Sequence, residues 1–460
     1  MLRSNIGPLE HIKKAANIGL QRSINRHLKV VFLGAGSFFL SSLFSDILRI
    51  PGTEFGEMCL VDIDKDRLAL AAKLCQKMIN DADKKWIVTC ETTHKQMLEN
   101  ANYIINCIEV SGTKCVEYDY HIPAKYGIKQ CIGDTSGPGG LMKAMRTVPV
   151  FLDILRDIKN ICPDAWVLNY TNPMSIMCLS AFRAGNNKVV GLCHSVQGTS
   201  KRLSEYLEID YEKLDWKCAG INHLSWFTKL TFNSENLYPV LLDKIRDEKM
   251  LAKDPIRFDI MKHFGFFVTE SSGHLSEYLP YYRKRPELIN KYCGAEWLGE
   301  SGFYAENWPT WRKSSDDRRG KQIAGLEKAF AERSTEYASY IIQAIETNQD
   351  YIIHGSVSNN SELISNLPKD GIVEVPCMVN GKGITPVEFG PLPPQCAALC
   401  DWNMRMYDLA ASACIERSLE LAKYALMLDP LTAAVCSPVE ISNMADELFA
   451  AEKDYLKLYS

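Results

Sequence analysis

The chain has 460 residues, of which 46% are hydrophobic and 23% charged, and its formal net charge is -4. This composition is typical of a soluble globular protein whose core is large enough for two or three closely joined domains. The small negative charge gives no general attraction for nucleic acid or anionic lipid, and no apolar run approaches the ~18 residues of a membrane span, so we expect neither partner and a small-molecule ligand instead.

The first 27 residues carry five Lys or Arg against one Glu and include a helical pattern from Leu9 to Arg22. A targeting peptide is one interpretation, but Glu10 and the lack of a cleavage-like pattern favour a surface extension. The 16 cysteines are scattered singly, with no CxxC pair. Together with the expected absence of a signal peptide, this favours reduced thiols and a cytoplasmic location.

A strand, a glycine turn and a helix follow in the order that dinucleotide-binding folds require. The apolar run 28–33 leads directly into Gly34-Ala35-Gly36-Ser37, and a helix-compatible stretch comes next. Gly34 permits a tight turn, and Gly36 lets the backbone approach a pyrophosphate at the N-terminus of the helix. The third position of the fingerprint holds Phe39 instead of glycine, so the turn alone is a partial match.

Asp62 stands within the next apolar run, 58–63, and lies 26 residues after Gly36. This is near the ~20 residues expected for the carboxylate that binds a ribose diol, and an acid there favours NAD over NADP. Asp62 could instead cap the following helix, as Asp64 could. We prefer the ribose role because of the glycine turn upstream. Strands and helices then alternate up to Val110 and complete a doubly wound half.

Two later segments are expected at the ligand-binding edge of this sheet. The glycine-rich loop 127–140, which contains Asp134, is too long for a simple connection and is expected to form a wall of the site. The helix 141–160 carries Arg146 in its second turn. Asn172 follows the next strand and could bridge cofactor ribose and substrate hydroxyls, although Asn before Pro is also a common turn former.

Cys193 and His194 end a further short apolar run, and His223 follows thirty residues after Cys193. A thiolate and an imidazole suit a divalent transition metal whose open positions could be filled by substrate hydroxyls and water. Spacing alone does not separate this from a buried thiol and a hydrogen-bonded structural histidine.

Polar groups concentrate again between residues 266 and 274, where Glu270 lies. The segment that follows offers Tyr278 and Arg283, which could serve as a base and as a clamp for a hydroxyl or carboxylate. An aromatic packing cluster is the alternative interpretation.

The rest of the chain has no internal repeat and no flexible linker after residue 27, so we expect the two halves to pack closely. A helix and its approach are predicted at 318–348 and a long amphipathic helix at 401–428. The predicted organisation is an extension at 1–27, an NAD-binding Rossmann domain at 28–195, and an α+β domain for substrate, metal and oligomerisation at 196–460.

Taken together, these segments resemble glycoside hydrolase family 4, the NAD- and manganese-dependent glycosidases, and most closely its α-galactosidase branch. The resemblance runs from about Lys29 to the C-terminus and implies an α/β fold of the lactate/malate dehydrogenase type, assembled as a homodimer or homotetramer. It is carried by motifs that are jointly specific: Gly34-Ala35-Gly36-Ser37, Asp62, Gly133-Asp134-Thr135, Gly137-Pro138-Gly139-Gly140, Asn172-Pro173, Gly191-Leu192-Cys193-His194-Ser195, Gly220-Ile221-Asn222-His223 and Thr269-Glu270-Ser271-Ser272.

The resemblance implies that Cys193 and His223 ligate Mn²⁺ and that NAD is a retained cofactor. Oxidation of the C3 hydroxyl of the sugar makes the C2 proton acidic, a base removes it, and the aglycone leaves by elimination before water adds and the hydride returns. His194 occupies the position that helps the leaving group depart, where some members have Asp, and histidine can donate a proton near neutral pH. Tyr278 is the first candidate for the base and Glu270 the second.

The resemblance favours an α-galactoside substrate, with an α-galacturonide or α-glucoside as alternatives, because Arg146 and Arg283 could each serve an acidic sugar. Two other classes stay open: a lactate/malate-type dehydrogenase, which would form net NADH, and an NAD-binding sensor with a structural Cys193/His223 pair. The candidate cofactor-binding residues are Gly34, Gly36, Ser37, Asp62 and Asn172, and the candidate substrate-binding residues are Asn172, Asp134, Arg146 and Arg283.

Overall fold

The computed structural model describes residues 20–330 and 332–460. The predicted N-terminal helix therefore lies almost entirely outside the described residues, and its last three residues, 20–22, are not helical. None of the helices in the described ranges is long and apolar enough to cross a membrane.

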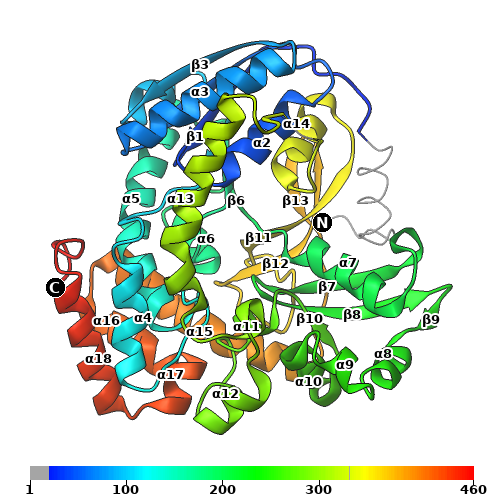
Figure 1. Cartoon of the computed structure of the whole chain (residues 1–460), viewed down its shortest axis with the longest axis vertical. Coiled ribbons are helices and arrows are strands. Elements are labelled where there is room, and N and C mark those ends of the chain that lie inside the picture. Colours follow the sequence, from blue (N-terminus) through cyan, green and yellow to red (C-terminus); the bar gives the residue numbers. More distant parts are fainter. Residues whose placement is uncertain (1–19, 331) are drawn as a thin grey trace.

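A single thirteen-stranded sheet runs through the molecule, and its first part is a Rossmann-type sheet (Figure 1). Six parallel strands lie in the order β3-β2-β1-β4-β5-β6. The chain adds strands on one side of β1 first and then on the other, and sheets of this kind bind ligands at the switch point, here between β1 and β4. Most of these strands are short apolar runs covered on both faces, as parallel strands require. Their bounds are β1 Leu28–Leu33, β2 Phe55–Val61, β3 Lys85–Glu91, β4 Tyr103–Asn106, β5 Trp166–Asn169 and β6 Val189–Leu192.

The helices of this half follow the predicted alternation with two differences. α5 begins four residues earlier than predicted, inside the glycine-rich loop, and α4 was not predicted. The side chain of Asp64 caps α3 by accepting a hydrogen bond from the amide of Arg67, so Asp62 does not serve as the cap. The elements are α2 Phe39–Leu48, α3 Lys65–Asp81, the short 3₁₀ turn η2 Lys95–Met97, α4 Val116–Lys125, α5 Gly137–Ile161 and α6 Met174–Arg183.

The sheet continues without a break into the second half of the chain. β6 pairs with β11 in the antiparallel sense, and the order beyond it is β12-β7-β8-β10, with β13 on β12 and β9 on β8. The predicted boundary after Ser195 thus falls at the start of a helix that follows β6, within one sheet. The strands are β7 Asp215–Ile221, β8 Leu224–Phe232, β9 Glu235–Asn236, β10 Phe267–Val268, β11 Tyr351–Ser358, β12 Ile372–Asn380 and β13 Gly383–Pro386.

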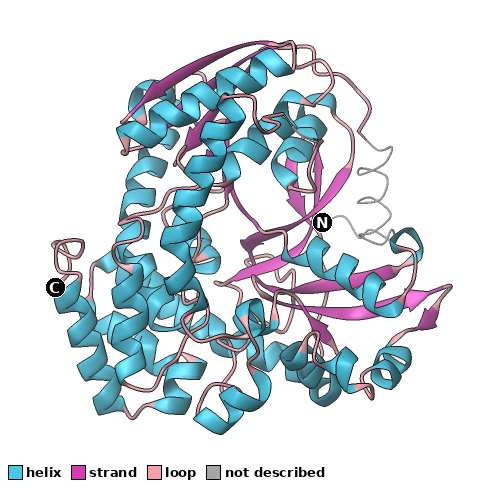
Figure 2. Cartoon of the chain, in the orientation of Figure 1, coloured by secondary structure: helices cyan, strands magenta, loops and turns pink. Residues whose placement is uncertain are grey.

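Helices cover both parts of this sheet (Figure 2). The helix predicted with its approach at 318–348 is α14, which begins at Tyr337, and the start of that range belongs to α13, which ends at Ile323. The long helix predicted at 401–428 is divided at Arg417, whose φ of 60° ends α15 before α16 begins. The helices are α7 Ser195–Leu207, η3 Tyr211–Lys213, α8 Tyr238–Lys244, α9 Glu248–Leu251, α10 Pro255–Phe264, α11 Ser272–Leu275, α12 Pro286–Tyr292, η4 Glu296–Leu298, α13 Phe303–Ile323, α14 Tyr337–Thr347, α15 Pro394–Glu416, α16 Leu419–Leu428, α17 Pro430–Val435 and α18 Pro438–Ala451.

One large hydrophobic core joins the two halves. It includes Val31 of β1, Ile353 of β11 and Ala410 of α15, all fully buried. A smaller core lies between the β7–β8 hairpin and α10, with Trp216 and Phe258 at its centre. The close packing predicted between the two halves is therefore present in the structure.

Candidate active site

A cavity of about 1720 Å³ lies between the two halves. Gly34 and Asp62 line one part of it, and Cys193, His223 and Glu270 line another. Pockets for one small ligand usually measure about 300–1,000 Å³. This cavity is larger, so a dinucleotide and a second ligand could occupy it together.

The glycine turn has the geometry expected of a dinucleotide site. Gly34 has a φ of +80°, and a Cβ atom there would lie 2.3 Å from the carbonyl oxygen of Cys107. At Gly36 a Cβ atom would lie 2.9 Å from the carboxylate of Asp62, which accepts a hydrogen bond of 2.6 Å from the Gly36 amide. Ser37 also lines the cavity, so all four cofactor candidates of this region lie together. The ring of Phe39, at the third fingerprint position, packs 5.3 Å from that of Tyr170.

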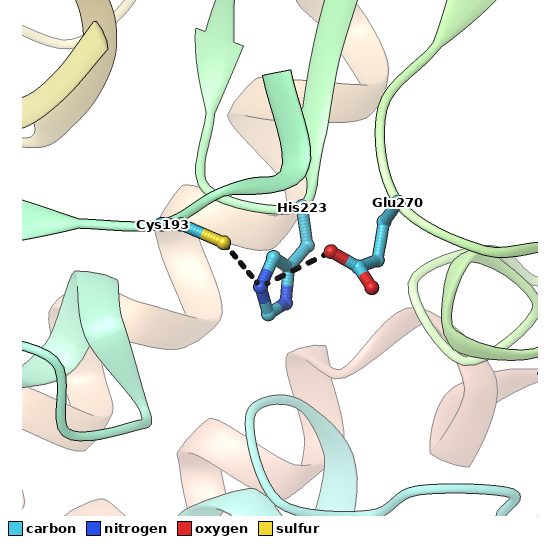
Figure 3. A group of neighbouring side chains, drawn as sticks. All are labelled: Cys193, His223 and Glu270. Atoms are coloured by element: carbon cyan, nitrogen blue, oxygen red, sulfur yellow. Dashed lines mark hydrogen bonds and ion pairs between the residues drawn. The ribbon is translucent and has the colours of Figure 1, made fainter. Parts of the chain in front are cut away.

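Three potential metal donors converge at the ends of three strands (Figure 3). Cys193 follows β6, His223 lies in the two-residue turn between β7 and β8, and Glu270 follows β10. The Cys193 sulfur is 3.3 Å and a Glu270 oxygen 3.5 Å from Nε2 of His223. His223 and Glu270 have φ values of 64° and 74°, and such left-handed conformations of non-glycine residues often occur at functional sites.

Burial lowers the pKa of His223 to about 4, so its imidazole is neutral near pH 7. Its Nδ1 lies 3.1 Å from the hydroxyl of Tyr278, which is fully buried and does not line the cavity. If Nδ1–H donates to this hydroxyl, Nε2 is left with a lone pair on the side of Cys193. The geometry therefore places Tyr278, the first candidate for the base, behind His223 and not on the lining of the cavity.

The donor set fits a divalent cation. The sulfur, nitrogen and carboxylate oxygen of the three side chains all lie within 4.8 Å of one another. Thiolate, imidazole and carboxylate together suit a transition metal. Burial raises the pKa of the Cys193 thiol well above its ordinary value, so a bound cation would have to displace a proton from the sulfur.

His194 lines the same cavity, and its side chain is 61% exposed. Its Nδ1 lies 3.3 Å from a carboxylate oxygen of Glu336. The hydrogen bond to Glu336 raises the pKa of His194, which increases the protonated fraction near neutral pH. An exposed, partly protonated imidazole beside the donor cluster has the properties of a general acid.

Asp134 and Asn172 face each other beside the donor cluster. The Asn172 side-chain amide donates a 3.2 Å hydrogen bond to Asp134, and the Lys143 ammonium lies 3.5 Å from the same carboxylate oxygen. Burial alone would raise the pKa of Asp134, but Lys143 and His274 lower it to about 2. Asp134 is therefore ionised at every ordinary pH and can accept hydrogen bonds from hydroxyl groups.

The loop that carries Asp134 is held from behind by Glu277. The buried Glu277 carboxylate accepts hydrogen bonds from the amides of Cys131, Ile132 and Gly133, at 2.7, 3.1 and 3.1 Å. Three main-chain donors on one carboxylate fix the path of the loop immediately before Asp134.

Several charged or polar residues that line the cavity were not among the sequence candidates, and three of them form a chain of contacts with Asp134: Glu109, Lys143 and His274. Lys143 pairs with Glu109 at 2.9 Å and so links the segment that follows β4 to α5. The ring of His274 packs at a tilt of 58° against that of His223, with 4.4 Å between the centroids. Its Nε2 lies 3.9 Å from a carboxylate oxygen of Asp134 and has no hydrogen-bond partner among the described residues. A signal for His274 was present, because it lies four residues after Glu270 in the same polar segment.

The structure does not bring Arg146 or Arg283 to this cavity. Arg146 is 3% exposed and bonds the carboxylates of Asp119 and Glu452. Arg283 is fully buried, and its guanidinium group donates to the hydroxyl of Ser276 and the carbonyl oxygen of Gly299. Both side chains are occupied by protein groups, so the expectation that they clamp an acidic sugar finds no support in the geometry.

Comparison with protein families matches residues 29–209 to the family 4 glycosyl hydrolases and residues 218–432 to their C-terminal domain. The chain is 38% identical over 438 residues to the alpha-galactosidase of Bacillus subtilis strain 168, covering 94% of this chain and 99% of that one. Its fold is similar to that of a solved 6-phospho-alpha-glucosidase from gut microorganisms in complex with NAD and Mn²⁺, with a TM-score of 0.77, 21% identity and coverage of 94% and 99%. The malate dehydrogenase of Picrophilus torridus also matches, with a TM-score of 0.53, 12% identity and coverage of 85% and 99%, which confirms the predicted fold class. The chain belongs to family 4 of the glycosyl hydrolases.

Proposed function

We propose that this chain hydrolyses α-galactosides with the help of a retained NAD and a divalent cation, Mn²⁺. The observation that carries the proposal is the cluster of Cys193, His223 and Glu270 in the same cavity as the Gly34–Gly36 turn and Asp62. The 38% identity to an alpha-galactosidase over nearly the full length of both chains supports the choice of sugar.

We assign dinucleotide binding to the first half of the chain, 28–195. The glycine turn leaves room for a pyrophosphate, and Asp62 lies where it can bind a ribose diol. Asn172 follows β5 and is placed to reach the ribose next to the nicotinamide. Cys193 and His223 hold the cation, with the carboxylate of Glu270 beside them.

When bound, the dinucleotide takes up and returns a hydride at C3 of the sugar, and the cation polarises the sugar oxygens beside the reacting carbons. Glu270 is the base that removes the C2 proton, because it lines the cavity whereas Tyr278 does not. The pKa of Glu270 lies well below the usual range. Burial alone would raise this pKa, but the lowering effect of His223 and His274 is larger. Glu270 is therefore ionised, and a carbonyl next to C2 reduces the basicity that the step requires.

His194 donates the proton that the leaving oxygen needs, from the exposed side of the donor cluster. Asp134 accepts hydrogen bonds from the ring hydroxyls and Asn172 donates to them. Nε2 of His274, which makes no hydrogen bond to the described residues, bonds another hydroxyl. Tyr278 acts through His223 by fixing the orientation of its ring, as partners of metal-binding histidines commonly do.

Neutral galactosides are favoured over galacturonides. A carboxylate on the sugar would need a free cation beside the donor cluster, but Arg146 and Arg283 are buried elsewhere. Of the other cations that line the cavity, Arg67, Arg312 and Arg319 contact Asp316, Asp64 and Ser37, on the side of the glycine turn. Lys143, the cation next to Asp134, already pairs with the carboxylates of Glu109 and Asp134. The cavity therefore offers hydrogen bonds for a neutral ring and little spare positive charge near the donor cluster.

The proposal is tested with α-galactoside, α-galacturonide, α-glucoside and β-galactoside substrates, each with and without NAD⁺, Mn²⁺ and a thiol reductant. We expect cleavage of the α-galactoside alone, dependent on NAD⁺ and Mn²⁺, with no net formation of NADH. Accumulation of NADH with 2-hydroxy acids, or cleavage that survives removal of the dinucleotide, would contradict it. In Cys193→Ser, unchanged NAD affinity with lost hydrolysis would exclude a sensor that merely binds the dinucleotide.

We further propose that the protein works in the cytoplasm as a homodimer or homotetramer. All sixteen cysteines are free thiols in the structure, and most are buried, which suits a reducing compartment. The oligomeric state follows from the family resemblance and is tested by sedimentation equilibrium, where a monomer across the micromolar range would contradict it.

A further inference from the structure

Four aromatic side chains between residues 297 and 311 line the cavity. Trp297 belongs to η4, while Tyr304, Trp308 and Trp311 are spaced along α13 so that they share one face of the helix. The rings of Trp297 and Trp311 are stacked, with centroids 5.9 Å apart and an interplanar angle of 8°. Tyr304 and Trp308 are stacked at 5.0 Å. Together the four rings form an aromatic wall.

The two ends of this wall rest on the segments that place the polar residues of the site. A Cβ atom on Gly273, next to His274, would lie 2.6 Å from the backbone oxygen of Trp297. The amide of Tyr304 donates a 3.0 Å hydrogen bond to the carbonyl oxygen of Cys131, three residues before Asp134. The aromatic wall therefore adjoins the sugar-binding part of the cavity at Trp297 and Tyr304, while the ring of Trp308 lies 5.1 Å from that of Phe38, beside the glycine turn.

Core packing alone does not account for the Trp297–Trp311 pair. The buried side of the wall is already filled by Phe303 and Ile132, which are 6% and 8% exposed. Trp297 is nevertheless 45% exposed. A large indole surface left open to water beside a polar site is typical of a ligand-binding surface.

Stacked indoles suit the face of a sugar ring. The aromatic face carries partial negative charge, and the C–H groups on one side of a pyranose carry partial positive charge, so the two surfaces attract when they lie flat together. The galactosyl ring itself must place its hydroxyls at Asp134, Asn172 and the donor cluster. The part of the substrate left to meet Trp297 is the group attached through the bond that is cleaved.

We propose that Trp297 and Trp311 are the residues that recognise the leaving group of the substrate, by stacking on the face of its ring. The inference rests on the proposed function and extends it from the galactosyl group to the side chains that select the aglycone. It assigns to these two indoles the preference for a galactoside whose leaving group carries a ring over one with a small alkyl aglycone.

The test compares two substrates in Trp297→Ala and Trp311→Ala: methyl α-galactoside and a disaccharide of galactose α-linked to glucose. We expect kcat/KM for the disaccharide to fall about tenfold, mostly through KM, as loss of one aromatic contact implies. For methyl α-galactoside we expect a change of less than about twofold. Trp297→Phe keeps a ring face and should restore most of the loss, which separates stacking from a change in folding.

Trp402→Ala is the matched control, because Trp402 is also partly exposed, at 37%, but lies on α15 and does not line the cavity. Equal losses on both substrates, or no loss on either, would overturn the subsite while leaving the proposed function intact. A weaker affinity of Trp297→Ala for NAD⁺ alone would also overturn it, since the wall would then serve the dinucleotide. A wild-type chain that cleaves neither galactoside would overturn the proposed function and the subsite with it.

Discussion

His223 illustrates how a single side chain is prepared for its role. The tight β7–β8 turn sets its backbone, burial keeps its ring neutral, and Tyr278 contacts Nδ1 so that Nε2 faces Cys193. The role of Tyr278 could not be predicted from its sequence position, since only the fold shows that its hydroxyl points to His223.

Tyr278→Phe distinguishes an orienting residue from a base. Loss of the hydroxyl frees the His223 ring, so we expect Mn²⁺ affinity to fall about tenfold or more, as measured by isothermal titration calorimetry. At saturating Mn²⁺ the exchange of the C2 proton of the sugar with solvent should persist. Abolished exchange with unchanged Mn²⁺ affinity would show instead that Tyr278 is the base.

Glu270→Gln removes the carboxylate charge while keeping the shape of the side chain. We expect C2 exchange and hydrolysis to fall by about 100-fold or more, because the amide cannot take up the proton. Mn²⁺ affinity should change by less than about tenfold. A much larger loss of affinity, with exchange restored by excess metal, would mean that Glu270 is chiefly a third ligand.

At the level of secondary structure, the glycine turn between β1 and α2 gives the sharpest prediction. Gly34→Ala puts a Cβ atom 2.3 Å from the Cys107 carbonyl oxygen at a φ of +80°, so the turn must shift. We expect a loss of about 2 kcal/mol or more in unfolding free energy, measured by urea titration, and a large loss of NAD affinity.

Gly320→Ala is the matched control for that variant. Gly320 lies in α13, where an added Cβ meets no atom within 4 Å. Alanine is the better helix former, so we expect a gain of up to about 1 kcal/mol. NAD affinity should stay unchanged. Equal effects of the two substitutions would contradict the account of the turn.

The elements that sequence reasoning found and missed differ for a physical reason. The parallel strands are short apolar runs bounded by glycine or polar residues, and burial on both faces makes such runs easy to recognise. The first part of α13 was missed, because only Phe303, Arg319 and Gln322 of its residues are buried. This helix covers a cavity with tryptophan and arginine side chains, so it lacks the apolar periodicity of a helix packed on a core. In Figure 1 it runs beside α3 along the first half.

At the scale of the whole molecule, the site depends on contacts between residues far apart in the chain. The motifs located most of the polar site, since Cys193, His194, His223, Glu270, Asp134 and Asn172 all line one cavity. The arginines lie outside this cavity because their partners are distant in the sequence: Arg146 bonds Glu452, 306 residues away. Sequence spacing carries no information about such a pair.

A further long-range contact joins the two halves and should be visible as a pH effect. Asp46 of α2 accepts hydrogen bonds from the amide and hydroxyl of Ser334, at 2.8 and 2.5 Å. Burial raises the pKa of Asp46 to about 6. A raised carboxyl pKa means that the folded state holds the proton more tightly than the unfolded state does. Its contribution is therefore complete below about pH 4 and is lost as the pH rises to about 6.

Asp46→Asn cannot ionise, so this part of the pH dependence should disappear. We expect the unfolding free energy of the wild type to lose about 3 kcal/mol more than that of the variant between pH 4 and pH 7, measured by urea titration. Asp164→Asn, at a fully exposed position, is the control and should match the wild type. An Asp46→Asn chain that keeps the wild-type pH dependence would refute the assignment.

The central claim is that cleavage proceeds through removal of the C2 proton by residues beside the Cys193–His223 cluster, with the dinucleotide in the same cavity. It is tested most directly with methyl α-galactoside carrying deuterium at C2, turned over in ordinary water with NAD⁺ and Mn²⁺ present. The account predicts that the released galactose has lost its deuterium to the solvent. Galactose that keeps all of its deuterium after complete turnover would contradict it.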